Sequence, residues 1–168
     1  MELELCAASI EAIDLAKKFA FDRIELCQNL EQGGLSPSAG LIAYALSKEL
    51  ETHVLIRPRA GGFFYSPEEL DVMKRDIEFC AKLGVKGVVV GILQENFDID
   101  GQALAHLMAE HPQLEWTFHR AFDESIDWKR SLDVLIKLGF QRVLTSGFAS
   151  NVELGMQQLQ TMASFASG

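Results

Sequence analysis

Short runs of apolar residues alternate along the whole chain with longer stretches in which apolar residues recur every three or four positions. Each run is about four to seven residues long, which is the length of a buried parallel strand. The predicted strands cover residues 3–6, 23–27, 53–57, 87–93, 114–119 and 142–145. Their starts lie about 20 to 34 residues apart, a spacing typical of repeated strand–helix units. The pattern therefore predicts one α/β domain, over residues 1–168, with about six such units.

Two of the intervening helices have recognisable ends. Ser66 followed by Pro67 is expected to begin the longest helix, because a serine oxygen accepts hydrogen bonds from free N–H groups and proline fits the first turn. Gly84 is expected to end this helix in the left-handed conformation. Asp127 and Gly139 are expected to bound a second helix in the same way.

The two faces of the predicted strands differ in chemistry. Alternation places Ile24 and Leu26 on one face of the second strand, with Arg23, Glu25 and Cys27 on the other. A barrel lumen can hold such ionisable groups if they pair or line a water-filled mouth, whereas an open sheet covered by helices on both sides cannot. The GxGxxG and GxxxxGK[ST] fingerprints of nucleotide-binding open sheets are absent. The predicted fold is a TIM-type (βα)8 barrel that is incomplete, with about six units present.

Composition narrows the class of partner. The 48% hydrophobic content excludes intrinsic disorder, and the net charge of −9 argues against nucleic acid or a polybasic membrane contact. No run reaches the roughly 20 apolar residues of a membrane span. Residues 1–4 are acidic where a signal peptide would be basic. We therefore expect a cytoplasmic protein with no nucleic-acid or membrane partner.

Polar residues gather where the predicted strands end. They are Cys6, Glu25, Cys27, Arg57, Arg59, His119, Arg120, Asp123 and Ser146. Ligands of parallel α/β folds bind outside the carboxyl ends of the strands, so these residues predict a site at one rim. A ring of structural ion pairs fits the same pattern. His53 lies at the opposite end and is interpreted as structural.

Arginine and histidine supply two kinds of candidate chemistry at this rim. Arg57 and Arg59 flank a proline before a glycine-rich turn, and arginine forks suit carboxylate or phosphate groups. His119 could act as a general acid or base or bind a metal. The alternatives are turn geometry for the glycines and a hydrogen-bonded structural role for the histidine.

Cys6 and Cys27 form the sharpest pair. Both end neighbouring strands on the inward face, and neighbouring strands lie about 4.8 Å apart. Two thiolates at that separation could bind a soft ion, Cu(I) before any other. The alternative is two small buried hydrophobic residues. With Cys80 the cysteines are three and widely spaced, so no disulfide framework is predicted.

Taken together, these residues lie in segments that resemble the CutC copper homeostasis family, and the resemblance covers essentially the whole chain. The segments are ELC at 4–6, DRIELC at 22–27, GGLSPS at 33–38, IRPR at 56–59, MKRDI at 73–77, GVVVG at 87–91, TFHRAFD at 117–123 and LTSG at 144–147. The resemblance implies a cytoplasmic (βα)8-type barrel linked to copper tolerance or trafficking, often dimeric, with copper on Cys6 and Cys27. It also implies a mouth built from Glu25, Arg57, Arg59, His119, Arg120 and Asp123.

The resemblance further implies that family members are longer, so this chain is expected to lack the last βα units of the barrel. Six strands leave two exposed edges, and we expect a homo-oligomer, a dimer, to cover them. The leading hypothesis is a cytosolic copper homeostasis protein that binds or traffics Cu(I) through the two cysteines.

The alternative hypothesis is a barrel enzyme that acts on a small anionic metabolite. Glu25, His119 and Asp123 would be its acid–base groups. Its substrate-binding residues would be Arg23, Arg57, Arg59, Arg120 and Ser146. The sequence leaves open whether the protein is an enzyme.

Overall fold

The computed structural model describes residues 2–166, and strands and helices alternate throughout. The strands are β1 (Glu4–Ala7), β2 (Arg23–Leu26), β3 (Glu51–Leu55), β4 (Gly87–Val90), β5 (Glu115–Phe118) and β6 (Arg142–Val143). The α-helices are α1 (Ile10–Lys18), α2 (Ala39–Ser47), α3 (Pro67–Leu83), α4 (Gly101–Ala109), α5 (Trp128–Leu138) and α6 (Val152–Ala166). Two 3-10 helices, Leu30–Gln32 and Arg120–Glu124, follow β2 and β5. All six strands predicted from the sequence are confirmed.

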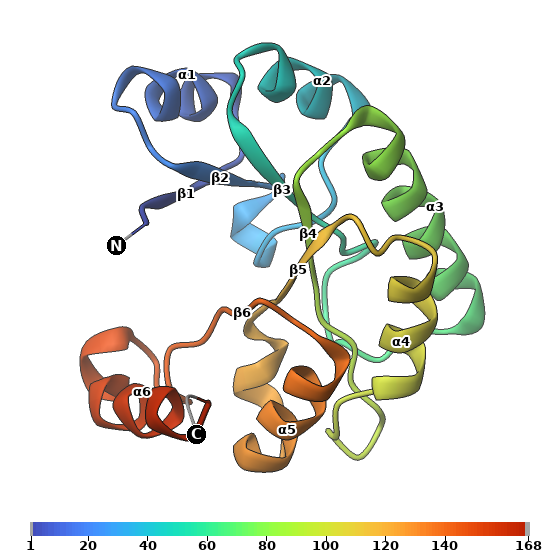
Figure 1. Ribbon diagram of the computed structural model, residues 1–168, viewed down its shortest axis with the longest axis vertical. Helices are drawn as coiled ribbons and strands as arrows, with labels where there is room; N and C mark the ends of the chain where they lie inside the picture. Colours follow the sequence, from blue (N-terminus) through green and yellow to red (C-terminus); the bar gives the residue numbers. More distant parts are fainter. Residues whose placement is uncertain (1, 167–168) are drawn as a thin grey trace.

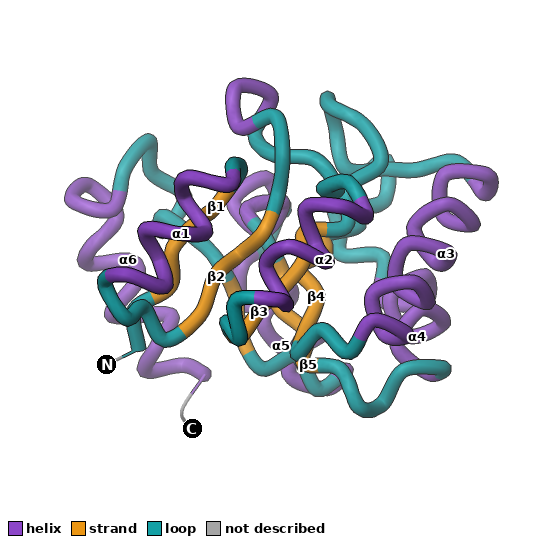
Figure 2. Tube along the Cα trace, turned by 90° about the horizontal axis from the view of Figure 1, so that it is seen from above, coloured by secondary structure: helices purple, strands orange, loops and turns teal. Residues whose placement is uncertain are grey.

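The strands form one parallel sheet in the order β1-β2-β3-β4-β5-β6. The sheet curls, and the helices lie on its convex side, as Figures 1 and 2 show from two directions. This arrangement is the curved strand–helix succession of a TIM-type barrel, with six units present in the described residues. The predicted fold class is therefore confirmed. None of the described helices is long and apolar enough to span a membrane.

The alternation of side chains separates two apolar layers. On the convex face, Leu26, Ile56 and Phe118 pack in the large core between the sheet and the helices. On the concave face, Cys27, Leu55 and Val89 form a small separate group, called here the lumen cluster. The division of faces predicted from strand alternation is the one observed, and it leaves the charged residues on the concave side.

The predicted helix ends are also observed. The Ser66 hydroxyl accepts a hydrogen bond from the Glu69 N–H, and the Glu69 carboxylate accepts one from the Ser66 N–H at 2.8 Å. Gly84 ends α3 with φ +81°, a conformation that favours glycine. Asp127 and Gly139 bound α5 as expected. These caps fix where α3 and α5 stop and hence where the loops of the barrel mouth begin.

Both edges of the sheet are free among the described residues. β1 pairs only with β2, and β6 pairs only with β5. Leu3, just before β1, is 52% exposed. Unpaired edges bind further strands, so the dimer expected from the sequence stays a prediction that the open sheet supports.

We expect this chain to sediment as a dimer, because self-association would cover the free edge at β1. Leu3→Lys should shift the equilibrium toward monomer, since it places a charge beside that edge. Leu15→Lys, at an exposed position of α1 on the convex side, is the matched control. A well-folded monomer at every concentration, measured by analytical ultracentrifugation, would contradict the prediction.

Candidate functional site

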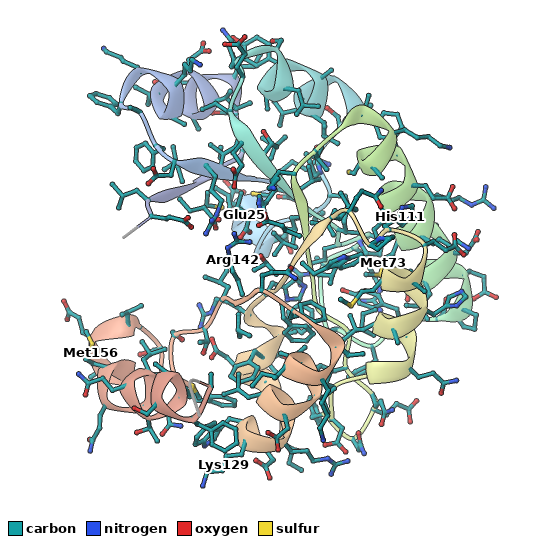
Figure 3. All side chains as sticks on the ribbon, in the orientation of Figure 1. Glu25, Met73, His111, Lys129, Arg142 and Met156 are labelled. Carbon is teal, nitrogen blue, oxygen red and sulfur yellow. The ribbon has the colours of Figure 1, made fainter. Side chains whose placement is uncertain are left out.

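The carboxyl ends of the strands, which form the barrel mouth, enclose a small cavity of about 160 Å³. The cavity is lined by Cys6, Glu25, Gly33, Leu55, Arg57, Phe63, His119, Arg120 and Leu144. Figure 3 shows Glu25 on the concave side of the sheet. The structure thus brings five of the residues predicted from the sequence to one cavity.

Cys6 lines this cavity, and Cys27 lies against Cys6 outside the lining. The Sγ atoms of Cys6 and Cys27 are 3.7 Å apart, although the Cα partner of Cys6 across the sheet is Glu25. The hydrogen bond from the Cys27 thiol lowers the pKa of Cys6 to about 7, against burial and the charge of Glu4. The same bond, together with burial, raises the pKa of Cys27. Cys6 is therefore a partly ionised and exposed thiol, and Cys27 is a buried donor to it.

Glu25 lies beside the thiols with its carboxyl group protonated. The residue is 7% exposed. Burial, followed by the negative charges of Cys6 and Glu4, raises the pKa of Glu25 to about 8. At neutral pH the carboxylic acid can therefore donate a hydrogen bond or a proton into the cavity.

His119 is a neutral, buried ring. Its Nδ1 accepts a hydrogen bond from the Ala121 N–H at 3.1 Å, which assigns the ring hydrogen to Nε2. Burial, and then the charge of Arg57, lowers the pKa of His119 to about 3. Its Nε2 has no partner among the described residues. The ring fits because Gly91 has no side chain, and a Cβ there would lie 2.2 Å from the His119 Cε1.

Arg57 holds two loops of the mouth together. Its guanidinium donates to the carbonyl oxygens of Gln32 at 2.9 Å, Gly34 at 3.0 Å and Gly61 at 2.7 Å. The ring of Phe63 lies against the same group, with its centroid 4.9 Å from the Arg57 Cζ. Because Arg57 is buried and bonded to backbone oxygens, it positions the loops more than it offers a free anion clamp.

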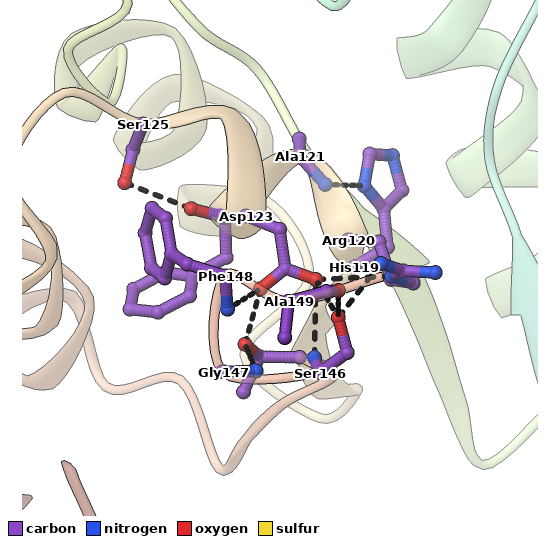
Figure 4. Close-up of polar contacts among 11 residues, drawn as sticks. His119, Arg120, Ala121, Asp123, Ser125, Ser146, Gly147, Phe148 and Ala149 are labelled. Carbon is purple, nitrogen blue, oxygen red and sulfur yellow. Dashed lines mark hydrogen bonds and ion pairs between the residues drawn. The ribbon is translucent and has the colours of Figure 1, made fainter. Parts of the chain in front are cut away.

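Asp123 links the loop after β5 to the loop after β6 (Figure 4). Its carboxylate accepts hydrogen bonds from the Thr145 hydroxyl, the Ser146 N–H at 3.1 Å and the Phe148 N–H at 3.2 Å. Burial opposes ionisation, but these bonds and Arg120 lower the pKa of Asp123 overall. Asp123 therefore stays ionised and fixes the geometry of the mouth.

Arg120 is the most accessible cation at the cavity. It donates to the Asp123 carboxylate at 3.0 Å and to the Ser146 hydroxyl at 2.8 Å, while its side chain stays 54% exposed. Ser146 in turn donates to the Ala149 carbonyl at 2.6 Å. Arg120 can therefore meet an incoming anion, while Ser146 helps to hold Arg120 in place.

Two predicted residues lie away from the cavity. Arg23 begins β2 at the opposite end of the strand and pairs with Glu2 and Glu4. Arg59 bonds to Glu69 on α3 and to the Phe64 carbonyl at 2.8 Å. Neither guanidinium lines the cavity.

The sequence assigned no chemistry to four residues of the cavity lining. Gly33, Leu55, Phe63 and Leu144 are apolar or lack a side chain, so they carry no chemical signature in one sequence. Phe63 nevertheless shapes the site, since its ring centroid lies 4.9 Å from that of His119. The glycine-rich turn before Phe63 gave only a signal for turn geometry.

A curled parallel sheet with a polar cavity at the carboxyl ends of its strands defines this chain as a TIM-barrel-type protein. The sequence model of the CutC family matches residues 1–168 of this chain. The chain therefore belongs to the CutC family.

Curated relatives agree with this assignment. A CutC protein of Bacteroides thetaiotaomicron is 43% identical over 169 residues, covering 99% of this chain and 68% of that protein. A human protein named copper homeostasis protein cutC homolog is 41% identical over 167 residues, covering 99% of this chain and 61% of that protein. The chain thus spans about two thirds of the length of the curated relatives that it matches.

Solved structures show the same fold. The crystal structure of a CutC protein from Streptococcus agalactiae has a TM-score of 0.93 and 34% identity, covering 100% of this chain and 84% of that one. A deoxyribose phosphate aldolase from Aeropyrum pernix, a TIM barrel, has a TM-score of 0.62 and 13% identity, covering 99% of this chain and 70% of that one. The second likeness concerns the fold alone.

Glu25→Gln should change how stability depends on pH. The folded chain keeps the Glu25 proton up to about pH 8, whereas the unfolded chain releases it near its ordinary pKa of about 4.3. The folded state therefore binds more protons in this window, and its stability falls as pH rises. When the pH rises from 4 to 8, the free energy of unfolding of the parent should fall by at least about 1 kcal/mol more than that of the variant.

Urea unfolding of parent and variant at the two pH values measures this shift. Glu11→Gln, at an exposed position of α1, is the control and should keep the pH dependence of the parent. If Glu25→Gln also keeps that dependence, Glu25 is not the protonated group.

Proposed function

We propose that this chain binds Cu(I) as cargo between Cys6 and Cys27. The observation that carries the proposal is the 3.7 Å separation of the two Sγ atoms. Cu(I) prefers soft thiolate ligands. The copper homeostasis name of the human relative supports the same ion.

The thiol geometry suits a bent site. With metal–sulfur bonds of about 2.3 Å, a separation of 3.7 Å corresponds to a sulfur–metal–sulfur angle of roughly 110°. Such an angle leaves room for a third donor on the cavity side. Cys6 is exposed, so an ion can reach the pair from solvent without opening the core.

The protonation states around the pair also suit a cation. Cys6 has a pKa of about 7, so its thiolate is available at neutral pH, and binding would displace the proton of Cys27 to solvent. Glu25 stays protonated at this pH and adds no negative charge beside the two sulfurs. Copper affinity should therefore rise with pH through the neutral range.

Anaerobic competition with a chromogenic Cu(I) chelator tests the proposal. We expect the reduced protein to bind one Cu(I), and the Cys6→Ser, Cys27→Ser variant to bind at least 100-fold more weakly, because both thiolates are lost. Cys80→Ser is the matched control, since Cys80 lies buried in the helix–sheet core. If the double variant competes as well as the parent, the proposal is wrong.

A second candidate function is catalysis on a small anionic metabolite, and the cavity that gathers Glu25, His119 and Arg120 favours it. Protonated Glu25 would serve as the acid, and the His119 Nε2–H would donate a hydrogen bond to the substrate. Exposed Arg120 would attract the anion.

A thermal-shift screen of small anionic metabolites separates the two functions. An anion that binds this cavity should stabilise both the parent and the Cys6→Ser, Cys27→Ser variant, and should lose its effect in Arg120→Gln. Arg75→Gln, on the exposed side of α3, is the matched control. Equal stabilisation of Arg120→Gln would contradict binding in this cavity.

A further inference from the structure

A second cluster of ligand atoms lies at the opposite end of the barrel, where the strands begin. Its members are Glu51 and His53 on β3 and Glu115 on β5. The His53 Nε2 lies 3.6 Å from the Glu51 Oε1 and 3.8 Å from the Glu115 Oε2. One donor atom from each residue lies within 4.8 Å of the other two.

His53 is the observation that points to a ligand. The residue is 0% exposed, and neither ring nitrogen has a hydrogen-bond partner among the described residues. Its distances to the two carboxylates are too long for hydrogen bonds. The Glu115 Oε2 facing it forms an ion pair with Arg142 at 2.7 Å, so the unpartnered atoms are the two nitrogens of His53. Buried polar atoms without partners are rare, so this imidazole requires an explanation.

The sheet leaves space for this imidazole. His53, Gly87 and Glu115 are successive Cα partners across β3, β4 and β5. A Cβ at Gly87 would lie 2.6 Å from the His53 Cε1 and Nδ1, so any larger residue would displace the ring. Glycine on β4 thus lets His53 reach across toward Glu115.

The two distances from the His53 Nε2 to the carboxylate oxygens fit ligands of one metal ion. Two donors each about 2.1 Å from an ion and 3.6 Å from each other subtend an angle of roughly 120°. Both ring nitrogens of His53 are buried without a hydrogen-bond partner among the described residues, so an imidazole lone pair is available to a metal. One imidazole with two carboxylates is a donor set that suits Zn²⁺, with water completing the coordination.

The charges around His53 are mixed: Arg142 and Arg23 act on it from one side of the balance, and Glu4 and Glu115 oppose them. Glu115 already pairs with Lys86 at 3.0 Å and Arg142 at 2.7 Å, but a carboxylate has lone pairs for a metal as well. Glu51 pairs with no Lys or Arg among the described residues, and its side chain is 40% exposed. Glu51 therefore supplies a negative charge that only the longer-range attraction of Lys86 offsets, and a route from solvent.

We propose that Glu51, His53 and Glu115 bind one Zn²⁺ ion that joins β3 to β5 across β4. The site lies at the amino ends of the strands, away from the cysteine pair at the barrel mouth. The proposal is independent of the proposed copper function. Its expected role is structural, since the ion would tie together strands that are not direct neighbours.

Calorimetric titration of the metal-free protein with Zn²⁺ tests the site. Because thiolates also bind Zn²⁺, the titration is made in the parent and in the Cys6→Ser, Cys27→Ser variant. We expect one equivalent to bind in the cysteine variant and to raise its melting temperature. Adding Glu51→Gln to that variant should weaken binding at least tenfold, while adding Glu49→Gln, on the neighbouring exposed turn, should not.

Glu51→Gln is the decisive change because Glu51 is partly exposed, so its loss should not prevent folding; circular dichroism checks this. Co²⁺ provides a second readout, since its visible bands report nitrogen and oxygen ligands in the cysteine variant. Absence of stoichiometric Zn²⁺ binding in the cysteine variant, or an unchanged affinity after Glu51→Gln, would overturn the proposal.

Discussion

Charged side chains on the concave face of the sheet must find partners inside the curl, because an unpaired buried charge is strongly destabilising. At the amino ends of the strands, Arg23 and Arg142 pair with glutamates. At the carboxyl ends, Arg57 and Asp123 bind mainly backbone groups of the loops. The apolar lumen cluster lies between these two polar layers. The fold therefore has two chemically distinct ends, which come close where Glu25 is the Cα partner of His53 across β2 and β3.

The mouth is shaped by groups whose hydrogen-bonding capacity is largely used. The Arg57 guanidinium donates hydrogen bonds to three carbonyl oxygens. The Asp123 carboxylate accepts hydrogen bonds from the loop that follows β6 and so joins it to the loop after β5. Besides the exposed cation Arg120, the groups left to act on a ligand are Cys6, Glu25 and the Nε2 of His119. Cys6, Glu25 and His119 have pKa values moved from their ordinary positions, as is common where a site does chemistry.

The sequence alone was enough to predict the strands, the two faces of the sheet and the approach of Cys6 to Cys27. These features follow from the two-residue alternation of side chains in a parallel sheet. The sequence could not predict the role of Arg57, because its partners are backbone oxygens, which every residue type carries. Helices α2 and α4 are largely apolar, so periodicity alone did not delimit them. Gly87 and Gly91 illustrate the same limit. Gly87 makes room for His53 on β3, and Gly91 makes room for His119 just after β5, which only the spatial arrangement of the strands reveals.

Cys6 and Glu25 are direct partners across the sheet, and each raises the cost of ionising the other. A metal that holds both thiolates would let the sulfurs carry negative charge while Glu25 remains a neutral acid. The second candidate function also begins with Glu25 protonated, but Glu25 becomes a carboxylate once it has given its proton to a substrate. The two candidate functions therefore share the resting state of Glu25 and differ after proton transfer. Because Coulomb repulsion between Cys6 and Glu25 opposes ionising both, copper loading should suppress proton donation by Glu25 rather than support it.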